Sequence, residues 1–155
     1  MKYILSVLAI SLFVSCSLDK NNNKEVKTDY TAENEQEIIA YIAKNNLDAV
    51  KSSSGLYYVI NEAGTGEQPT ASSTVTVAYK GYYSNGSVFD QSDTEGISFG
   101  LSRVIAGWTE GIAYFKEGGN GILLVPSHLG YGSANSRGIP GGSVLIFDVA
   151  LISVQ

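Results

Sequence analysis

From residue 55 onward, apolar and polar positions alternate in short runs, the pattern of β-strands with one buried face. In the run 74–83, "TVTVAYKGYY", we expect Val75, Val77 and Tyr79 to share the buried face. The dipeptide Asn85-Gly86 then predicts a hairpin, with "SVFD" as its returning strand. Further apolar runs predict strands over residues 56–60, 121–126 and 143–154.

A helical pattern replaces this alternation within the stretch "RVIAGWTEGIAYF". Apolar residues recur there at spacings of three, four and three, which places them on one helix face: Ile105, Trp108, Ile112 and Phe115. Gly107 and Gly111 lie inside this short helix, although glycine destabilises helix interiors. The simplest interpretation makes Trp108 part of the core. A pocket floored by its indole would explain the poor helix, and we expect Gly107 to leave room beside the ring.

A second helical pattern covers about residues 32–45. We expect Thr31 to cap its start and Asn45-Asn46 to end it. Three acidic residues suit the positive end of the helix dipole: Glu33, Glu35 and Glu37. A rough apolar stripe follows: Ile38, Ile39, Ile42 and Val50. We therefore expect a helical extension over residues 31–54, in front of a strand-rich domain over 55–155.

The composition fits one folded domain. The chain has 155 residues, 44% of them hydrophobic and 16% charged, which is enough to form a core. Its 17 glycines and 10 tyrosines favour strands joined by tight turns. The predicted class is α+β, with a twisted antiparallel sheet packed on one short helix. The net charge of −5, without a basic stripe, argues against a nucleic-acid partner.

Residues 1–15 have the features of a secretory signal peptide, with Lys2 ahead of an apolar run too short to span a bilayer. The only cysteine, Cys16, follows directly and resembles the lipidation site of bacterial lipoproteins, although Phe13 stands where leucine is usual. We expect a lipid anchor on Cys16, a flexible tether over residues 16–30 and a location in the bacterial cell envelope. The alternative is an ordinary secreted protein with an incidental cysteine.

Five segments, in this order, resemble the FKBP-type peptidyl-prolyl cis–trans isomerases: "SGLYYVINEAGTGEQP", "VTVAYKGYYSNGSVFDQS", "RVIAGWTEGI", "LLVPSHLGYG" and "GIPGGSVLIFDVALISV". The resemblance covers residues 55–155. It implies a curved antiparallel sheet that wraps around one short helix, with a pocket between the helix start and the concave face. It also implies prolyl isomerase activity on proline-containing polypeptides, helping exported proteins to fold.

The resemblance assigns the pocket residue by residue: Tyr79, Phe89, Asp90, Val104, Ile105, Trp108, Tyr131, Ile139 and Phe147, with Ile97 or Phe99 closing one side. It implies that the N–H of Ile105 and the hydroxyl of Tyr131 hold substrate carbonyls. It implies that Asp90 acts at the pocket edge, in contact with a tyrosine hydroxyl. No metal, nucleotide or other cofactor is implied.

The chemistry of these residue types suits that activity. Rotation about an X–Pro bond breaks amide resonance, and the twisted amide is less polar than the planar one. A dry aromatic cup therefore favours the twisted state over the planar one. Macrolide inhibitors are a further expected ligand. The loop before Ile139 carries Ser136 and Arg137 where many relatives have a histidine, which affects sequence preference and macrolide affinity.

Two other functions are compatible with parts of the sequence. The fold could serve as a binding or chaperone module with little turnover. The stretch "GISFG" also matches the G-x-S-x-G pattern of hydrolases around Ser98, with His128 and Asp148 as partners in an unusual order. His128 is more simply a structural residue at a strand end. The short apolar stripe of the first helix favours a monomer.

Overall fold

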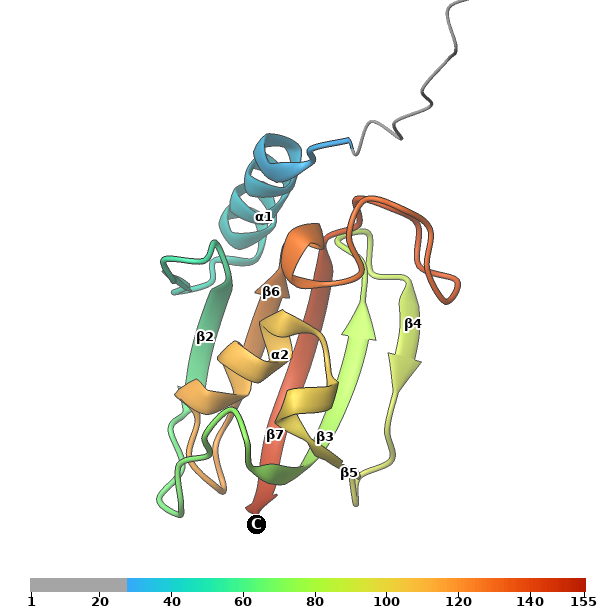
Figure 1. Cartoon of the computed structure of the whole chain (residues 1–155). Coiled ribbons are helices and arrows are strands. Elements are labelled where there is room, and N and C mark those ends of the chain that lie inside the picture. The colour runs from blue at the N-terminus through green and yellow to red at the C-terminus, as the bar shows by residue number, and fades with distance from the viewer. Residues whose placement is uncertain (1–27) are drawn as a thin grey trace, which may run out of the picture.

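The computed structural model describes residues 28–155, which form one curved sheet and two α-helices (Figure 1). The helices are α1 (Thr31–Asn45) and α2 (Ala106–Gly111). The strands are β1 (Val50–Lys51), β2 (Tyr57–Glu62), β3 (Thr74–Tyr82), β4 (Val88–Gln91), β5 (Ile97–Gly100), β6 (Asn120–Val125) and β7 (Leu145–Val154). Short 3₁₀ turns cover Leu101–Arg103, Ile112–Tyr114 and Ser127–Leu129.

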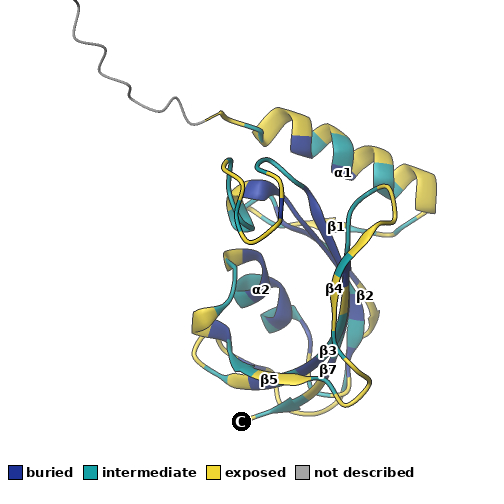
Figure 2. Cartoon of the chain, turned by 90° about the vertical axis from the view of Figure 1, so that its right-hand side faces the viewer, coloured by how far each residue is buried: buried dark blue, intermediate teal, exposed yellow. Residues whose placement is uncertain are grey.

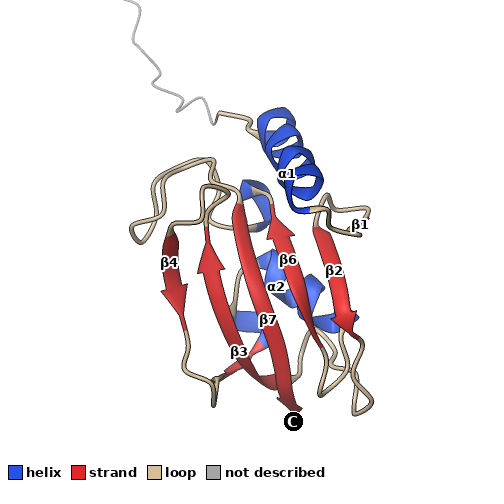
Figure 3. Ribbon diagram, turned by 180° about the vertical axis from the view of Figure 1, so that it is seen from behind, coloured by secondary structure: helices blue, strands red, loops and turns tan. Residues whose placement is uncertain are grey.

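All strand pairs are antiparallel, in the order β1-β2-β6-β7-β3-β4, with β5 also paired to β3. The sheet curves around α2, and α1 lies outside that curve at one end of the sheet (Figure 2). This arrangement confirms the predicted α+β class. The sheet therefore has a concave face that carries α2 and a convex face that carries α1 (Figure 3).

The predicted alternation explains how the two faces of the sheet are filled. Val75 and Val77 are fully buried on the concave side, as expected for β3. In β7, alternate residues join the same concave core: Leu145, Phe147, Val149 and Leu151. Ile146 between them belongs to a separate cluster on the convex side, which includes Ile38 of α1. Every second side chain of β7 thus faces the pocket side.

The "GISFG" stretch is not a nucleophile elbow. It forms β5, a strand antiparallel to β3, and the sequence pattern did not predict it. Ser98 is exposed, and its hydroxyl is hydrogen-bonded to Thr76 at 2.8 Å. The ring nitrogen Nε2 of His128 instead lies 2.9 Å from the backbone carbonyl oxygen of Ser54. The hydrolase interpretation therefore lacks its serine–histidine pair and its strand–turn–helix context.

The glycines of α2 allow close packing against β6. A Cβ on Gly107 would lie 2.5 Å from Cγ1 of Val125, and one on Gly111 would lie 2.7 Å from Cδ2 of Leu123. These contacts place Val125 against Gly107, and the expectation that Gly107 leaves room beside the indole stays a prediction. The helix tolerates two poor helix formers because they bring Trp108 down onto the sheet.

Helix α1 differs from expectation at its start and along its stripe. Thr31 does not cap the helix; its N–H and hydroxyl both donate to Asp29, at 2.9 and 2.6 Å. Ile38 is fully buried, but Ile39 is 50% exposed and Val50 belongs to β1, at 51% exposure. The apolar stripe is thus narrower than predicted, and the extension over 31–54 includes a strand. The helix ends as expected, with Asn46 in the left-handed conformation.

A buried polar side chain, Asn34, compensates for this narrow stripe. Asn34 is 2% exposed; its amide nitrogen donates to the carbonyl of Gly142 and its oxygen accepts from the N–H of Ser127, both at 2.7 Å. These partners lie at the two ends of the loop between β6 and β7. Asn34 therefore fastens α1 to both ends of that loop.

Replacing Asn34 by alanine should lower the free energy of unfolding by about 2 kcal/mol, because the buried N–H of Ser127 and the half-buried carbonyl of Gly142 lose their partner. Denaturant unfolding followed by circular dichroism measures this loss. The matched control is Gln36→Ala on the exposed side of α1, which should change stability by less than about 0.5 kcal/mol. Equal effects of the two substitutions would contradict this role for Asn34.

The predicted signal peptide, Cys16 and the tether up to residue 27 lie outside the described residues. Among residues 28–155, no helix combines the length and apolar character needed to cross a bilayer.

Candidate active site

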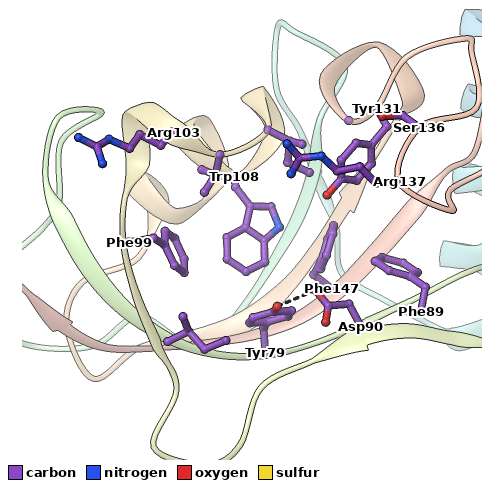
Figure 4. A pocket seen from close by; sticks show the side chains of 14 residues that line it. Tyr79, Phe89, Asp90, Phe99, Arg103, Trp108, Tyr131, Ser136, Arg137 and Phe147 are labelled. Atoms are coloured by element: carbon purple, nitrogen blue, oxygen red, sulfur yellow. Dashed lines mark hydrogen bonds between the residues drawn. The ribbon is translucent and has the colours of Figure 1, made fainter.

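A pocket of about 510 Å³ opens between the start of α2, the concave face of the sheet and the loop between β6 and β7 (Figure 4). Its lining consists of Tyr79, Phe89, Asp90, Ile97, Phe99, Arg103, Val104, Ile105, Trp108, Gly130, Tyr131, Ser136, Arg137 and Phe147. Besides Tyr131, five of these residues are aromatic and three are charged, so aromatic rings and charged groups both line the cavity.

Trp108 lies at the base of this pocket and is 5% exposed. Its ring packs edge-to-face against Tyr79 and Phe147, with centroids 5.0 and 5.1 Å apart, and is tilted against Phe99 at 5.3 Å. Within residues 28–155, its indole nitrogen is the only buried side-chain N or O atom without a hydrogen-bond partner. Aromatic neighbours thus hold the ring firmly, and its remaining surface borders the cavity.

Three strands place the walls. Tyr79 comes from β3, Phe89 from β4 and Phe147 from β7. In β3, Gly81 lies opposite both Asp90 and Phe147 in the strand register. A Cβ on Gly81 would lie 2.7 Å from Phe89 and 2.9 Å from Phe147, so the missing side chain lets these two rings meet edge-to-face at 5.6 Å.

One hydrogen bond fixes the polar edge of the cup. The Tyr79 hydroxyl donates to Oδ2 of Asp90 at 2.7 Å, drawn as the dashed line in Figure 4. Burial, followed by the hydrogen bond to Asp90, raises the pKa of Tyr79 far above its usual range. Tyr79 therefore remains a protonated donor at any physiological pH, and the Asp90 carboxylate keeps a fixed orientation.

Two further donors face the pocket without partners among the described residues. The N–H of Ile105, which precedes the first turn of α2, donates no hydrogen bond there. The Tyr131 hydroxyl makes no hydrogen bond with the described part of the chain either. Both residues line the cavity, and each carries a hydrogen-bond donor that a ligand carbonyl could accept from.

The structure brings together all the pocket residues expected from the sequence except Ile139. Ile97 and Phe99 both line the cavity, where only one was expected. Ile139 is 7% exposed and packs in the concave core, to which the lining residues Trp108 and Phe147 also belong. Its expected role in substrate binding stays a prediction.

Arg103 and Gly130 are lining residues that sequence reasoning missed. Their positions gave some signal, since Arg103 directly precedes Val104 and Gly130 directly precedes Tyr131. Residues 28–155 contain no cluster of three or more His, Cys, Asp or Glu side chains arranged to hold a metal ion. The lining residues present aromatic surfaces, hydrogen-bond donors and the carboxylate of Asp90.

Comparison with known proteins gives this geometry a family. A model of the FKBP-type peptidyl-prolyl cis-trans isomerase family matches residues 65–152. The FKBP-type peptidyl-prolyl cis-trans isomerase FkpA of Escherichia coli is 50% identical over 106 residues, which cover 67% of this chain and 39% of that protein. FkpA of Buchnera aphidicola subsp. Schizaphis graminum is 39% identical over 146 residues, covering 89% of this chain and 58% of the relative.

Solved structures agree with the sequence comparisons. The crystal structure of Escherichia coli FkpA superposes with a TM-score of 0.72 at 45% identity, covering 81% of this chain and 61% of that one. A peptidyl-prolyl cis-trans isomerase from Pseudomonas syringae pv. tomato has a TM-score of 0.72 at 29% identity; the match covers 83% of this chain and 98% of that one. The chain thus spans less than two thirds of the FkpA proteins that it matches. On sequence and fold together, the chain belongs to the FKBP-type peptidyl-prolyl cis–trans isomerase family.

Proposed function

We propose that this chain catalyses cis–trans isomerisation of X–Pro bonds in polypeptides. The observation that carries the proposal is the cavity over Trp108, which is walled by aromatic rings and carries two unpartnered donors, the Ile105 N–H and the Tyr131 hydroxyl. A prolyl ring fits such an apolar cup, and the adjacent amide oxygens need donors. Family membership supports the same activity.

The proposed mechanism needs no covalent step. The prolyl ring rests on Trp108, the Ile105 N–H binds a substrate carbonyl near the reacting bond, and the Tyr131 hydroxyl binds the carbonyl before proline. Anchoring both ends leaves the amide between them free to rotate. The apolar walls favour the less polar twisted amide over the planar one, and each ~1.4 kcal/mol of this preference gives a tenfold increase in rate.

The expected substrates are proline-containing segments of exported proteins during folding. The signal-like residues 1–15 and Cys16 support a place in the bacterial cell envelope, with a lipid on Cys16 as the membrane anchor. A single acyl chain binds a bilayer only weakly, so firm anchoring requires more than one. We further propose that the domain acts as a monomer and binds macrolides that mimic a prolyl peptide.

Phe89→Ala should lower kcat/KM on a short X–Pro peptide about tenfold, because it opens one apolar wall of the cup to water. A protease-coupled assay on the full chain measures this rate. Val88→Ala is the matched control: Val88 is the preceding residue in β4, is 47% exposed and does not line the pocket. It should leave kcat/KM unchanged.

Two outcomes of this assay would count against the proposal. A folded wild-type chain that leaves the peptide at its uncatalysed rate would refute isomerase activity. If that chain still bound the peptide, the fold would serve as a binding or chaperone module instead.

A further inference from the structure

The chain contains two arginines, Arg103 and Arg137, and both line the pocket, whereas none of the lysines in residues 28–155 does so. We propose that these arginines give the pocket a preference for polypeptide segments with an acidic side chain next to the proline. The proposal rests on the isomerase function proposed above and defines its substrate class.

The two guanidinium groups stand on opposite sides of the pocket (Figure 4). Arg103 ends the 3₁₀ turn before α2 and lies beside Phe99, while Arg137 lies beside Tyr131 on the loop between β6 and β7. Both residues are exposed. Within the described part of the chain the one ion pair joins Lys51 to Glu35, so neither arginine is neutralised there. In Figure 4 the guanidinium of Arg137 reaches toward Trp108, whereas that of Arg103 lies at the rim and points away from the aromatic residues.

The backbone conformation of Arg137 is one that arginine adopts unfavourably, so the needs of the turn do not explain an arginine at this position. Arg137 and Gly138 have φ values of +51° and +82°, inside a two-residue hairpin closed by hydrogen bonds between Ser136 and Ile139. Such a turn favours asparagine followed by glycine, because asparagine tolerates the left-handed conformation. Arginine at this position costs local stability and places a long cationic side chain over the cavity.

The charges near the pocket favour an acidic ligand there, whereas the net charge of the chain does not. The full chain carries a net charge of −5, so its overall charge does not attract an acidic peptide. Asp90 is the only acidic lining residue, and its carboxylate already accepts the hydrogen bond from Tyr79. A guanidinium binds a carboxylate through two parallel hydrogen bonds, which makes Arg103 and Arg137 suitable receptors.

The position of Tyr131 indicates which substrate residue Arg137 contacts. In the proposed mechanism the Tyr131 hydroxyl binds the carbonyl of the residue before proline. Arg137 lies on the same side of the pocket as Tyr131 (Figure 4), so its guanidinium faces the side chain of that preceding residue. Arg103 lies at the opposite rim and adds positive charge there without reaching toward Trp108. A glutamate before proline is therefore the preferred partner of Arg137.

The test compares two peptides of equal shape, Ala-Glu-Pro-Phe and Ala-Gln-Pro-Phe, with the full chain at low salt. The wild type should isomerise the glutamate peptide with a kcat/KM about threefold higher, the size expected for a solvent-exposed charge pair. Arg137→Asn should bring this ratio close to one, because asparagine keeps the turn and removes the charge. Molar salt screens the charge pair, so it should also bring the wild-type ratio of the two kcat/KM values closer to one.

Lys116→Gln is the matched control, since it removes one positive charge from an exposed residue outside the pocket. It should leave the wild-type ratio unchanged. A wild-type ratio of one or less, with both peptides accelerated, overturns the acidic preference and leaves the isomerase function standing. An equal fall in the ratio with Lys116→Gln also overturns it, because net charge alone would then explain the preference. If neither peptide is accelerated, the proposed function itself fails.

Discussion

Trp108→Ala is expected to lower kcat/KM on X–Pro peptides by about tenfold or more, and to lower the free energy of unfolding by about 3–5 kcal/mol. The indole is both the floor of the cavity and part of the concave core, where it contacts Tyr79, Phe99 and Phe147. Its removal leaves a void beneath the prolyl ring that water can enter. Because Trp108 is the only tryptophan, unfolding should be followed by circular dichroism.

Phe115→Ala separates the two roles of Trp108. Phe115 is fully buried at the far end of the helical segment and does not line the pocket. Its loss should cost a similar free energy of unfolding while kcat/KM of the folded fraction is retained. Trp108→Leu serves as a milder variant that keeps an apolar side chain without the flat ring. Equal losses of kcat/KM in Phe115→Ala and Trp108→Leu, measured where both are folded, would argue against the indole floor.

Of the glycine-to-alanine substitutions in the sheet, Gly121→Ala should lower the free energy of unfolding the most. A Cβ at Gly121 would lie 1.9 Å from the carbonyl oxygen of Val59 and 2.8 Å from Cε1 of Phe115. The first atom is backbone of the neighbouring strand β2, so the clash is relieved only by separating β2 from β6. We expect a loss of about 3 kcal/mol or more, a large part of the stability of a small domain.

Gly100→Ala is the comparison for this effect. The nearest heavy atom to a Cβ at Gly100 is Oγ of Ser102 at 3.9 Å, and the backbone there has φ −78° and ψ 130°, which alanine adopts freely. Its effect on thermal unfolding should be small or slightly stabilising. If Gly121→Ala and Gly100→Ala had the same melting temperature, the close approach of β2 to Gly121 of β6 would be contradicted.

Local patterns predicted those parts of the fold that depend on neighbouring residues. Alternation along β3 and β7 identified the buried face, and the spacing around Trp108 identified α2. Strand β5 was missed because it is only four residues long, ends on a glycine and is defined by its pairing with β3. The docking of α1 was only partly predicted, because the polar residue Asn34 replaces part of the apolar stripe.

The pocket required more than local pattern. Its aromatic lining followed from the family resemblance, since no single aromatic residue distinguishes a site from a core. Ile139 is not among the residues that line the cavity, and its expected role in substrate binding stays a prediction. Arg137 was expected near the pocket from its loop, whereas Arg103 was recognised as a lining residue only in the folded structure.

The most direct test of the central claim is exchange NMR of an X–Pro peptide mixed with a small amount of the full chain. The account predicts that cis–trans exchange accelerates in proportion to protein concentration, and that proline ring protons show nuclear Overhauser effects to the indole of Trp108. Exchange at the rate of the free peptide, in the presence of a folded chain, would contradict the account. Accelerated exchange with nuclear Overhauser effects from the proline ring to other residues, and none to the Trp108 indole, would also contradict the account.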